Sequence, residues 1–317
     1  MTCPARDAQF MKSKYCVHLF GKFEIRSKEG VWCCRENSKV HELFSYLLLH
    51  RKVPQNREQL ASVFWGETAT QQSKKYLRQT LWQLQPLCKS HLGLGSQELF
   101  LSENETILFN PAIELWIDVE AFQSALSHIR PNLPLDAPTA QKLRLAVDLY
   151  QGDLLEGWYP DWCLYEREHL QNLYLAVLDK LTSYCEAQGD YETGLWYATR
   201  ILKCDPARER AHQQIMRIAY LMGDRTAALR QFEHCRDALQ KELGVAPAKQ
   251  TRLLYERIRQ DQVDREPEPP VNFPPSSPAP LTTMLAHFRQ LQSSLTQLQQ
   301  ELHTEIQLLE SSFPQQK

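Results

Sequence analysis

Residues 56–87 read NREQLASVFWGETATQQSKKYLRQTLWQLQPL and predict two helices joined by a short polar loop. Asn56 suits the N-cap position of a first helix over residues 57–65, which carries apolar residues at helical spacing. Residues 67–70 are polar, and a second helix is expected over residues 71–87. This pairing predicts a helix-turn-helix unit.

The flanking segments extend this unit on both sides. Residues 15–26 alternate apolar and polar side chains around Gly21, which predicts a pair of strands. Residues 38–50 carry apolar residues at helical spacing and predict a third, preceding helix. Residues 99–109 predict a β-hairpin with a polar tip. Strands, three helices and a hairpin in this order are typical of a winged helix-turn-helix.

The rest of the chain is expected to be helical up to residue 262 and contains an internal repeat. Gly189-Asp190 recurs as Gly223-Asp224, a period of 34 residues, and the small residue Gly194 recurs as Ala228. Thirty-four residues is the tetratricopeptide period, with one helical hairpin in each unit. The sequence therefore predicts a tetratricopeptide-like array, in which stacked hairpins bury a shared core.

The C-terminal segment has a different composition. Residues 267–280 contain 7 of the 18 prolines, which predicts a stiff, extended linker. Apolar residues at coiled-coil spacing follow at Leu281, Phe288, Leu291, Leu295, Leu298, Leu302 and Leu309. We expect this helix to mediate homo-oligomerisation. The alternative is an amphipathic helix that docks on its own chain.

The predicted fold class is therefore mainly α, with a small α+β winged helix, an all-α tetratricopeptide-like array and a coiled-coil helix. The predicted segments are a flexible N-terminus (1–14), the winged helix-turn-helix (15–112), the helical domain (113–262), the Pro-rich linker (263–280) and the coiled-coil helix (281–312).

Charge is distributed unevenly along the 317 residues. Residues 1–110 hold 15 Lys and Arg against 10 Asp and Glu, whereas residues 111–317 hold 21 against 28. A basic segment joined to an acidic remainder is a hint of nucleic-acid binding. Residues 68–97 contain no acidic residue at all, and they include most of the second helix of the helix-turn-helix.

Several other classes of protein are disfavoured by the sequence. It has no apolar run of the roughly 20 residues that a membrane span requires and no signal-like stretch at its N-terminus, so we expect a cytoplasmic protein. The nine cysteines lack zinc-finger spacing, which predicts free thiols and no metal site. G-x-S-x-G, H-E-x-x-H and G-x-G-x-x-G motifs are absent, so we expect no catalytic residues and no cofactor.

The second helix of the helix-turn-helix has two contrasting faces. Leu77, Leu81, Leu84 and Cys88 lie together at 100° per residue, which predicts the buried face. The candidate DNA-contacting residues are Lys74, Lys75, Arg78, Gln79, Trp82 and Lys89. Arg and Lys pair with guanine, Gln pairs with adenine, and Trp offers apolar surface to thymine. The alternative for an outward Trp is packing against another part of the same protein, such as the helical domain.

Sequence motifs add a family resemblance. The winged-helix motifs are residues 47–50 (LLLH), 57–60 (REQL), 64–65 (FW), 76–81 (YLRQTL), 109–111 (FNP) and 116–122 (WIDVEAF). The helical motifs are residues 150–155 (YQGDLL), 161–162 (DW), 166–168 (ERE), 205–212 (DPARERAH), 223–229 (GDRTAAL) and 239–245 (LQKELGV). The first set resembles an OmpR-type winged helix, and the second resembles a bacterial transcriptional activator domain. Together they are similar to the SARP-type transcriptional regulators of bacteria.

This resemblance implies a mechanism. The second helix of the helix-turn-helix would enter the major groove of double-stranded DNA at direct repeats upstream of a promoter, and the hairpin wing would touch the adjacent backbone. RNA polymerase would be contacted by the helical domain and by the loop residues Gly66, Glu67, Thr68 and Thr70.

The sequence departs from the family pattern in two respects. The wing tip at residues 102–105 is acidic, so we expect a weak wing contact with DNA. The chain also lacks the G-x-x-x-x-G-K-[ST] motif of the ATPase module that many larger relatives carry.

Two functions remain open from the sequence. The preferred one is a sequence-specific DNA-binding transcription activator. The alternative is a protein-interaction scaffold whose basic winged domain binds an acidic protein. Substitution of Lys75, Arg78 or Gln79 distinguishes the two, because only the first function requires them for DNA affinity.

Overall fold

The computed structural model describes residues 15–27, 30–33, 38–91, 97–103, 105–127 and 135–262. These ranges belong to one compact unit, residues 1–262, and residues 263–317 form a second unit. The predicted N-terminal segment 1–14, the Pro-rich linker and the coiled-coil helix with its seam from Leu281 to Leu309 lie outside the described residues and stay predictions.

The first sheet combines strands from both ends of the winged domain. Its order is β3-β2-β1-β7, with bounds β1 (Tyr15–His18), β2 (Glu24–Ser27), β3 (Gly30–Cys33) and β7 (Leu115–Ile117). The predicted strand pair is confirmed, and Gly21 in its turn adopts the left-handed φ of 84° that favours glycine. β7 runs parallel to β1 and lies beyond residue 112, where the sequence predicted the winged domain to end.

Three helices follow: α2 (Lys39–Leu49), α3 (Arg57–Trp65) and α4 (Thr70–His91). Asn56 caps α3 as predicted, because its side-chain Oδ1 accepts hydrogen bonds from the Glu58 and Gln59 amides at 2.8 and 3.2 Å. α4 continues past Pro86 and ends four residues later than predicted. Cys88 in this last turn is fully buried, so core packing stabilises the extension.

The predicted hairpin forms the wing. β5 (Phe100–Glu103) and β6 (Thr106–Phe109) pair antiparallel, and the short β4 (Gln55–Asn56) joins the other side of β6. Ile107 and Phe109 on β6 are buried, whereas Thr106 and Leu108 are partly exposed, which is the alternation expected of a half-buried strand. The wing is thereby packed against the core of the helix-turn-helix.

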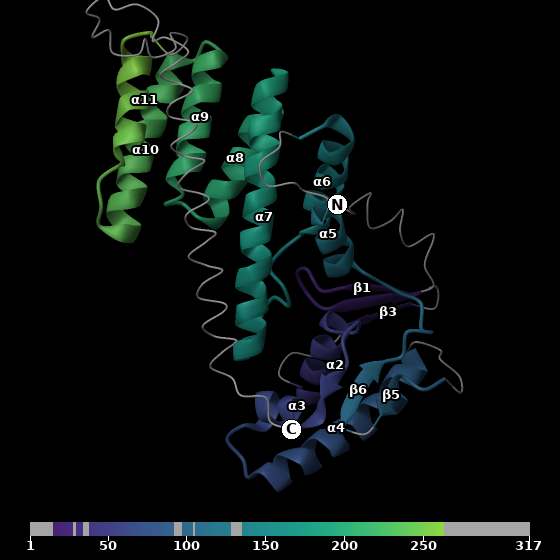
Figure 1. The fold of residues 1–317 in the computed structure, drawn as a ribbon. Coiled ribbons are helices and arrows are strands. Elements are labelled where there is room, and N and C mark those ends of the chain that lie inside the picture. Colours follow the sequence, from purple (N-terminus) through teal and green to yellow (C-terminus); the bar gives the residue numbers. More distant parts are fainter. Residues whose placement is uncertain are drawn as a thin grey trace, which may run out of the picture. The chain divides into compact units, whose positions relative to one another are not determined.

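The remaining residues form seven helices within the described part of the chain. Their bounds are α5 (Asp118–Leu126), α6 (Ala137–Leu149), α7 (Asp161–Gln188), α8 (Tyr191–Cys204), α9 (Glu209–Leu221), α10 (Arg225–Leu243) and α11 (Lys249–Arg259). Each helix from α7 to α11 packs against the next (Figure 1). Gly189 and Gly223, with φ of 73° and 83°, end the first helix of successive pairs, so the 34-residue repeat is confirmed. This winged helix followed by a helical array confirms the predicted fold class for the described residues.

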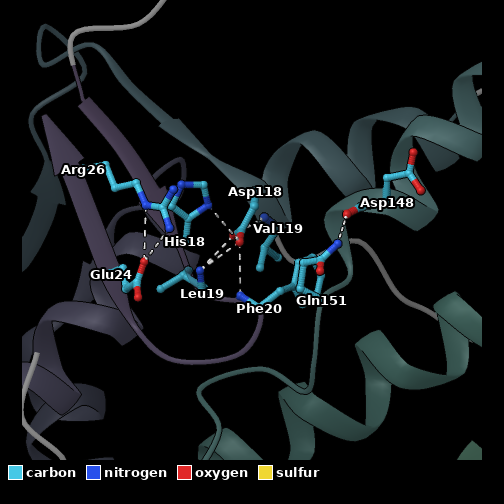
Figure 2. A network of polar contacts seen from close by, with 9 residues as sticks. All are labelled: His18, Leu19, Phe20, Glu24, Arg26, Asp118, Val119, Asp148 and Gln151. Atoms are coloured by element: carbon cyan, nitrogen blue, oxygen red, sulfur yellow. Dashed lines mark hydrogen bonds and ion pairs between the residues drawn. The ribbon is translucent and has the colours of Figure 1, made fainter. Parts of the chain in front are cut away.

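Asp118 joins the winged helix to the helical array (Figure 2). It is the first residue of α5, and its carboxylate is fully buried. Its Oδ1 accepts hydrogen bonds from the Leu19 and Val119 amides at 2.9 and 2.8 Å, and its Oδ2 accepts from the Phe20 amide at 3.2 Å. The carboxylate therefore holds the end of β1 directly against the start of α5.

A loop before α7 reinforces this connection. The Gly21 amide donates to the Asp153 carbonyl at 2.8 Å, and the Glu156 amide donates back to the Gly21 carbonyl at 2.8 Å. Arg167 on α7 fixes the loop from its other side, and its guanidinium donates to the carbonyls of Leu154, Leu155 and Trp158 at 3.0, 2.9 and 2.8 Å. The motifs at residues 150–155 and 166–168 thus serve this connection.

Among the helices of the described residues, none is long and apolar enough to cross a membrane. In the same residues, no group of three His, Cys, Asp or Glu side chains is placed to hold a metal ion. The described cysteines include six free thiols, of which only Cys204 is exposed.

Candidate nucleic-acid interface

The inner face of α4 fixes the helix to the winged domain. The helical spacing predicted a buried face, and its members Leu77, Leu84 and Cys88 are at most 1% exposed. Leu81 on the same face is half-buried. These side chains lie against the same core as α2 and α3. The burial fixes the rotation of α4 about its axis and so determines which residues face outward.

The outer face of α4 collects four of the six candidate residues. Lys75, Arg78 and Gln79 are exposed, and the Trp82 side chain is 74% exposed. Trp82 therefore does not pack against the helical domain within the part of the chain that the structure describes. α4 contains no Asp or Glu, so no carboxylate of its own reduces the positive charge of this face.

The other two candidates differ from these four. The Lys74 Nζ lies 3.3 Å from Glu58 Oε1 on α3, in an exposed ion pair. Exposed pairs of this kind contribute about 0–1 kcal/mol, so a competing anion can displace one at little cost. Lys89 is half-buried near the C-terminal end of α4. The structure thus separates these two lysines from the exposed face.

A hollow between α4 and the wing adjoins the exposed face. Its walls carry Arg78, Trp82 and Gln85 from α4, together with Arg57 and Ser102. Its apolar lining comes from Leu81, Phe100 and Ile107. Among the residues that the structure describes, two arginines and no carboxylate line this hollow. Sequence reasoning missed Arg57, because only the folded chain brings α3 next to β5.

Arg57 links α3 to the wing. Its amide donates to the Glu105 carbonyl at 2.8 Å, and its Nη2 donates to the Ser102 hydroxyl at 3.1 Å. Its Nε is buried and has no hydrogen-bond partner among the described residues. The predicted helix and the predicted hairpin each contained one half of this contact, but neither pattern indicated that the two meet.

The loop between α3 and α4 holds the residues that the resemblance assigned to RNA polymerase. The Thr68 hydroxyl and amide both donate to the Trp65 carbonyl, at 2.9 and 3.1 Å. A Cβ at Gly66 would lie 2.7 Å from the Ser62 carbonyl oxygen, so the tight turn requires glycine. Glu67 and Thr70 are exposed. The loop backbone is therefore fixed while these side chains stay accessible.

Aromatic and polar contacts place α2 and α3 against α7. The Trp162 ring packs edge-on against Tyr46, with ring centroids 5.3 Å apart, and also contacts Phe64. His50 Nε2 lies 3.8 Å from Glu166 Oε1. Burial lowers the pKa of His50 from its usual value, and the nearby Glu166 carboxylate acts in the opposite direction. These contacts hold the helix-turn-helix against the helical array.

Comparison with known proteins identifies the second part of the chain. The model of the bacterial transcriptional activator domain matches residues 117–259, which run from the end of β7 to the end of α11. The chain is also 30% identical over 118 residues to the regulatory protein AfsR of Streptomyces coelicolor. The chain therefore carries a region similar to the bacterial transcriptional activator domain. This match bears out the resemblance that the helical motifs indicated for this part of the chain.

A solved structure shows a similar fold. The structure is of Mycobacterium tuberculosis EmbR in complex with a low affinity phosphopeptide, and it matches 79% of the chain with a TM-score of 0.62 and 15% identity. The chain spans 66% of that EmbR chain, and its match to AfsR covers 37% of this chain and 12% of AfsR. The matching family model describes a transcriptional activator domain, and AfsR is described as a regulatory protein.

Proposed function

We propose that this protein is a SARP-type regulator that binds double-stranded DNA in a sequence-specific manner and activates transcription from promoters that contain direct repeats. The observation that carries the proposal is the outer face of α4, where Lys75, Arg78, Gln79 and Trp82 are all exposed on a helix without a carboxylate. The major groove of B-DNA admits an α-helix, and these side chains are suited to reading bases there.

The residues have distinct roles in this proposal. Arg78 and Lys75 donate hydrogen bonds to the O6 and N7 of guanine, and Gln79 pairs with the N6 and N7 of adenine. Trp82 contacts the methyl group of thymine. Lys74 and Lys89 lie away from the exposed face and bind phosphates, which orients the protein on DNA without reading the sequence.

Recruitment of RNA polymerase is assigned to the loop residues Gly66, Glu67, Thr68 and Thr70 and to the helical domain. The fixed backbone and exposed side chains of this loop support the assignment, because a preorganised surface loses little entropy when a partner binds. A Glu67→Ala, Thr70→Ala double variant is expected to keep operator affinity and to lose activation in a purified transcription reaction. Equal activation by the variant would contradict this role.

The proposal includes self-association through the predicted helix 281–312 and action in the bacterial cytoplasm. The support is the seam from Leu281 to Leu309 in the sequence, since apolar residues at this spacing pair helices. A Leu295→Asp, Leu302→Asp variant is expected to become monomeric by light scattering. An unchanged mass would contradict the oligomer.

DNA recognition is tested with the full chain and fragmented genomic DNA, and the recovered fragments are sequenced. Wild type, Arg78→Ala and Lys241→Ala are compared at two salt concentrations. Lys241 is 83% exposed on α10 and serves as the charge-matched control. Enrichment of a repeated motif that survives higher salt and is lost only in Arg78→Ala supports the proposal.

The opposite result is equally informative. If recovery is independent of sequence, disappears at higher salt and is equal in all three proteins, the basic face provides phosphate attraction alone. The proposal of sequence-specific regulation would then fail. The alternative of a scaffold that binds an acidic protein would replace it.

A further inference from the structure

We infer that the hollow between α4 and the wing is a phosphate-binding site for the DNA backbone, with Arg57 as its main ligand. This inference rests on the proposed function and names a contact that no sequence motif assigns. It carries no base information, so its expected effect on DNA binding differs from that of Arg78.

The two arginines of the hollow carry positive charge that the described residues do not neutralise. Neither Arg57 nor Arg78 forms an ion pair with a carboxylate of the described residues, although both line the same hollow. Arg51, only six residues before Arg57, instead forms two hydrogen bonds with Glu120, at 2.6 and 2.7 Å. Two guanidinium groups that share one hollow without a counter-charge repel each other, and an anion between them would remove that repulsion.

Arg57 stands at an unfavourable end of α3 for a cation. It is the first residue of α3, a helix of nine residues, and the N-terminus of a helix carries partial positive charge. A cation is unfavourable there and an anion is favourable. The helix dipole therefore disfavours Arg57 in the free protein, whereas it favours a phosphate held by the guanidinium near this end of α3.

The wing holds the Arg57 guanidinium in place. Ser102 accepts a hydrogen bond from the Arg57 Nη2 at 3.1 Å and so holds the guanidinium beside the hollow. The buried Nε has no partner among the described residues. Arginine binds phosphate through parallel N–H groups, and the hydrogen bond to Ser102 orders the guanidinium before a phosphate binds.

The hollow lies where the DNA backbone would pass if α4 occupied the major groove. With α4 in the major groove and the wing beside it, one DNA strand passes between α4 and β5, where Arg78 and Ser102 face the hollow from opposite sides. The Arg57 amide is bonded to the Glu105 carbonyl, so the same residue holds the wing. A phosphate on Arg57 therefore sets the position of α4 and the wing together.

The test measures dissociation constants at five salt concentrations for the recovered operator and for a scrambled fragment of equal length. The proteins are wild type, Arg57→Gln, Arg57→Lys, Arg78→Ala and Lys241→Ala, all as the full chain. Gln keeps a donor for Ser102 and removes the charge, so the variant is expected to fold. Melting temperatures check this independently of DNA binding.

We expect Arg57→Gln to weaken binding several-fold on both fragments and to reduce the slope of log affinity against log salt by about 1. Arg57→Lys should recover the slope, because a point charge still binds phosphate. Lys241→Ala should match wild type. A merely structural role for Arg57 would lower the melting temperature without this change in slope.

Three results would overturn the inference. One is wild-type affinity and slope in Arg57→Gln, which leaves the proposed function intact if wild type still selects the operator. Another is loss on the operator alone, as expected for Arg78→Ala, because it would indicate base reading. The third is a wild-type protein that selects no DNA sequence, which removes the proposed function and the inference with it.

Discussion

Asp118 and Arg57 occupy the same position in two helices, but the protein treats them in opposite ways. Each is the first residue of its helix, α5 and α3 respectively. The Asp118 carboxylate is fully buried and accepts hydrogen bonds from the Leu19, Phe20 and Val119 amides. The Arg57 guanidinium lines an open hollow, makes one hydrogen bond to Ser102 and leaves Nε without a described partner.

This difference separates a structural polar group from a binding one. An acid at a helix N-terminus is stabilised by the helix dipole, and its backbone donors compensate for its burial. A base at the same position is disfavoured, so folding alone does not explain it. Asp118 is therefore expected to determine stability, whereas Arg57 and the neighbouring face of α4 are expected to determine affinity.

The largest predicted effect is on stability. Asp118→Ala leaves the Leu19 and Phe20 amides buried without their acceptor, and each such loss costs about 1–3 kcal/mol. We expect the free energy of unfolding to fall by roughly 3 kcal/mol or more, measured by urea denaturation.

The control for this prediction is Asp161→Ala. Asp161 is the first residue of α7 but is exposed, so its removal should cost less than about 1 kcal/mol. Equal losses in the two variants would show that the buried network of Asp118 adds nothing to the effect of the helix dipole.

The next effect is on DNA recognition. Lys75→Ala removes a donor from the exposed face of α4, and we expect operator affinity to fall by about 1–3 kcal/mol with relaxed sequence preference. Unfolding free energy should be unchanged, because Lys75 is exposed. Competition between operator and scrambled DNA measures the preference.

Lys74→Ala is the matched comparison, since Lys74 is paired with Glu58 and lies off that face. It should weaken operator and scrambled DNA alike. Identical behaviour of the two lysine variants would remove the distinction between base-reading and phosphate-binding residues on α4.

A smaller effect is the dependence of stability on pH through the buried side chain of His212. His212 is 3% exposed, its Nε2 lies 2.9 Å from the Pro206 carbonyl, and its Nδ1 lies 2.7 Å from the Gln231 amide nitrogen. Burial lowers the pKa of His212 below its usual 6.5. The folded protein thus binds this proton less readily than the unfolded chain, and stability should fall as pH drops below about 6.5.

Melting temperatures at pH 7.5 and 5.5 measure this dependence. We expect it to be smaller in His212→Gln and unchanged in His234→Gln, because His234 is exposed. Burial also lowers the pKa of His50, so the single variant should leave a residual slope. A full wild-type slope in a His50→Gln, His212→Gln double variant would disprove the assignment.

The smallest predicted effect is an increase in DNA affinity. Glu105 is exposed at the wing and its charge repels a phosphate near the hollow. Glu105→Gln keeps the carbonyl that binds the Arg57 amide, and DNA affinity should rise by up to about 1 kcal/mol at low salt. Glu114→Gln, an exposed acid on the segment before β7, is the control and should change affinity less. Weaker binding by Glu105→Gln would show that the acidic wing favours DNA.

Much of the winged domain could be predicted from local patterns. The bounds of α3 follow from the Asn56 cap and from a turn that requires Gly66. The buried face of α4 follows from the spacing of Leu77, Leu84 and Cys88. Such features depend on residues close together in the chain, which is why periodicity and capping rules indicated them.

The missed features depend on contacts between distant residues. β7 is only three residues long and pairs with β1, from which it is separated by about 100 residues. Arg57 meets Ser102 across 45 residues, and the patterns around the two residues predict their elements but not their contact. No local pattern encodes either contact, so the connection of the two domains and the hollow became visible only in the folded chain.

The pairing of β7 with β1 also bears on how such regulators can be recombined. A winged helix cut at residue 112 would lose β7 and the carboxylate of Asp118, leaving one edge of β1 open for pairing with other chains. A helical domain that starts at residue 113 would carry an orphaned strand in return. Exchange of winged-helix domains between relatives, in evolution or by design, therefore succeeds most readily when the crossover leaves residues 115–118 with the sheet that they complete.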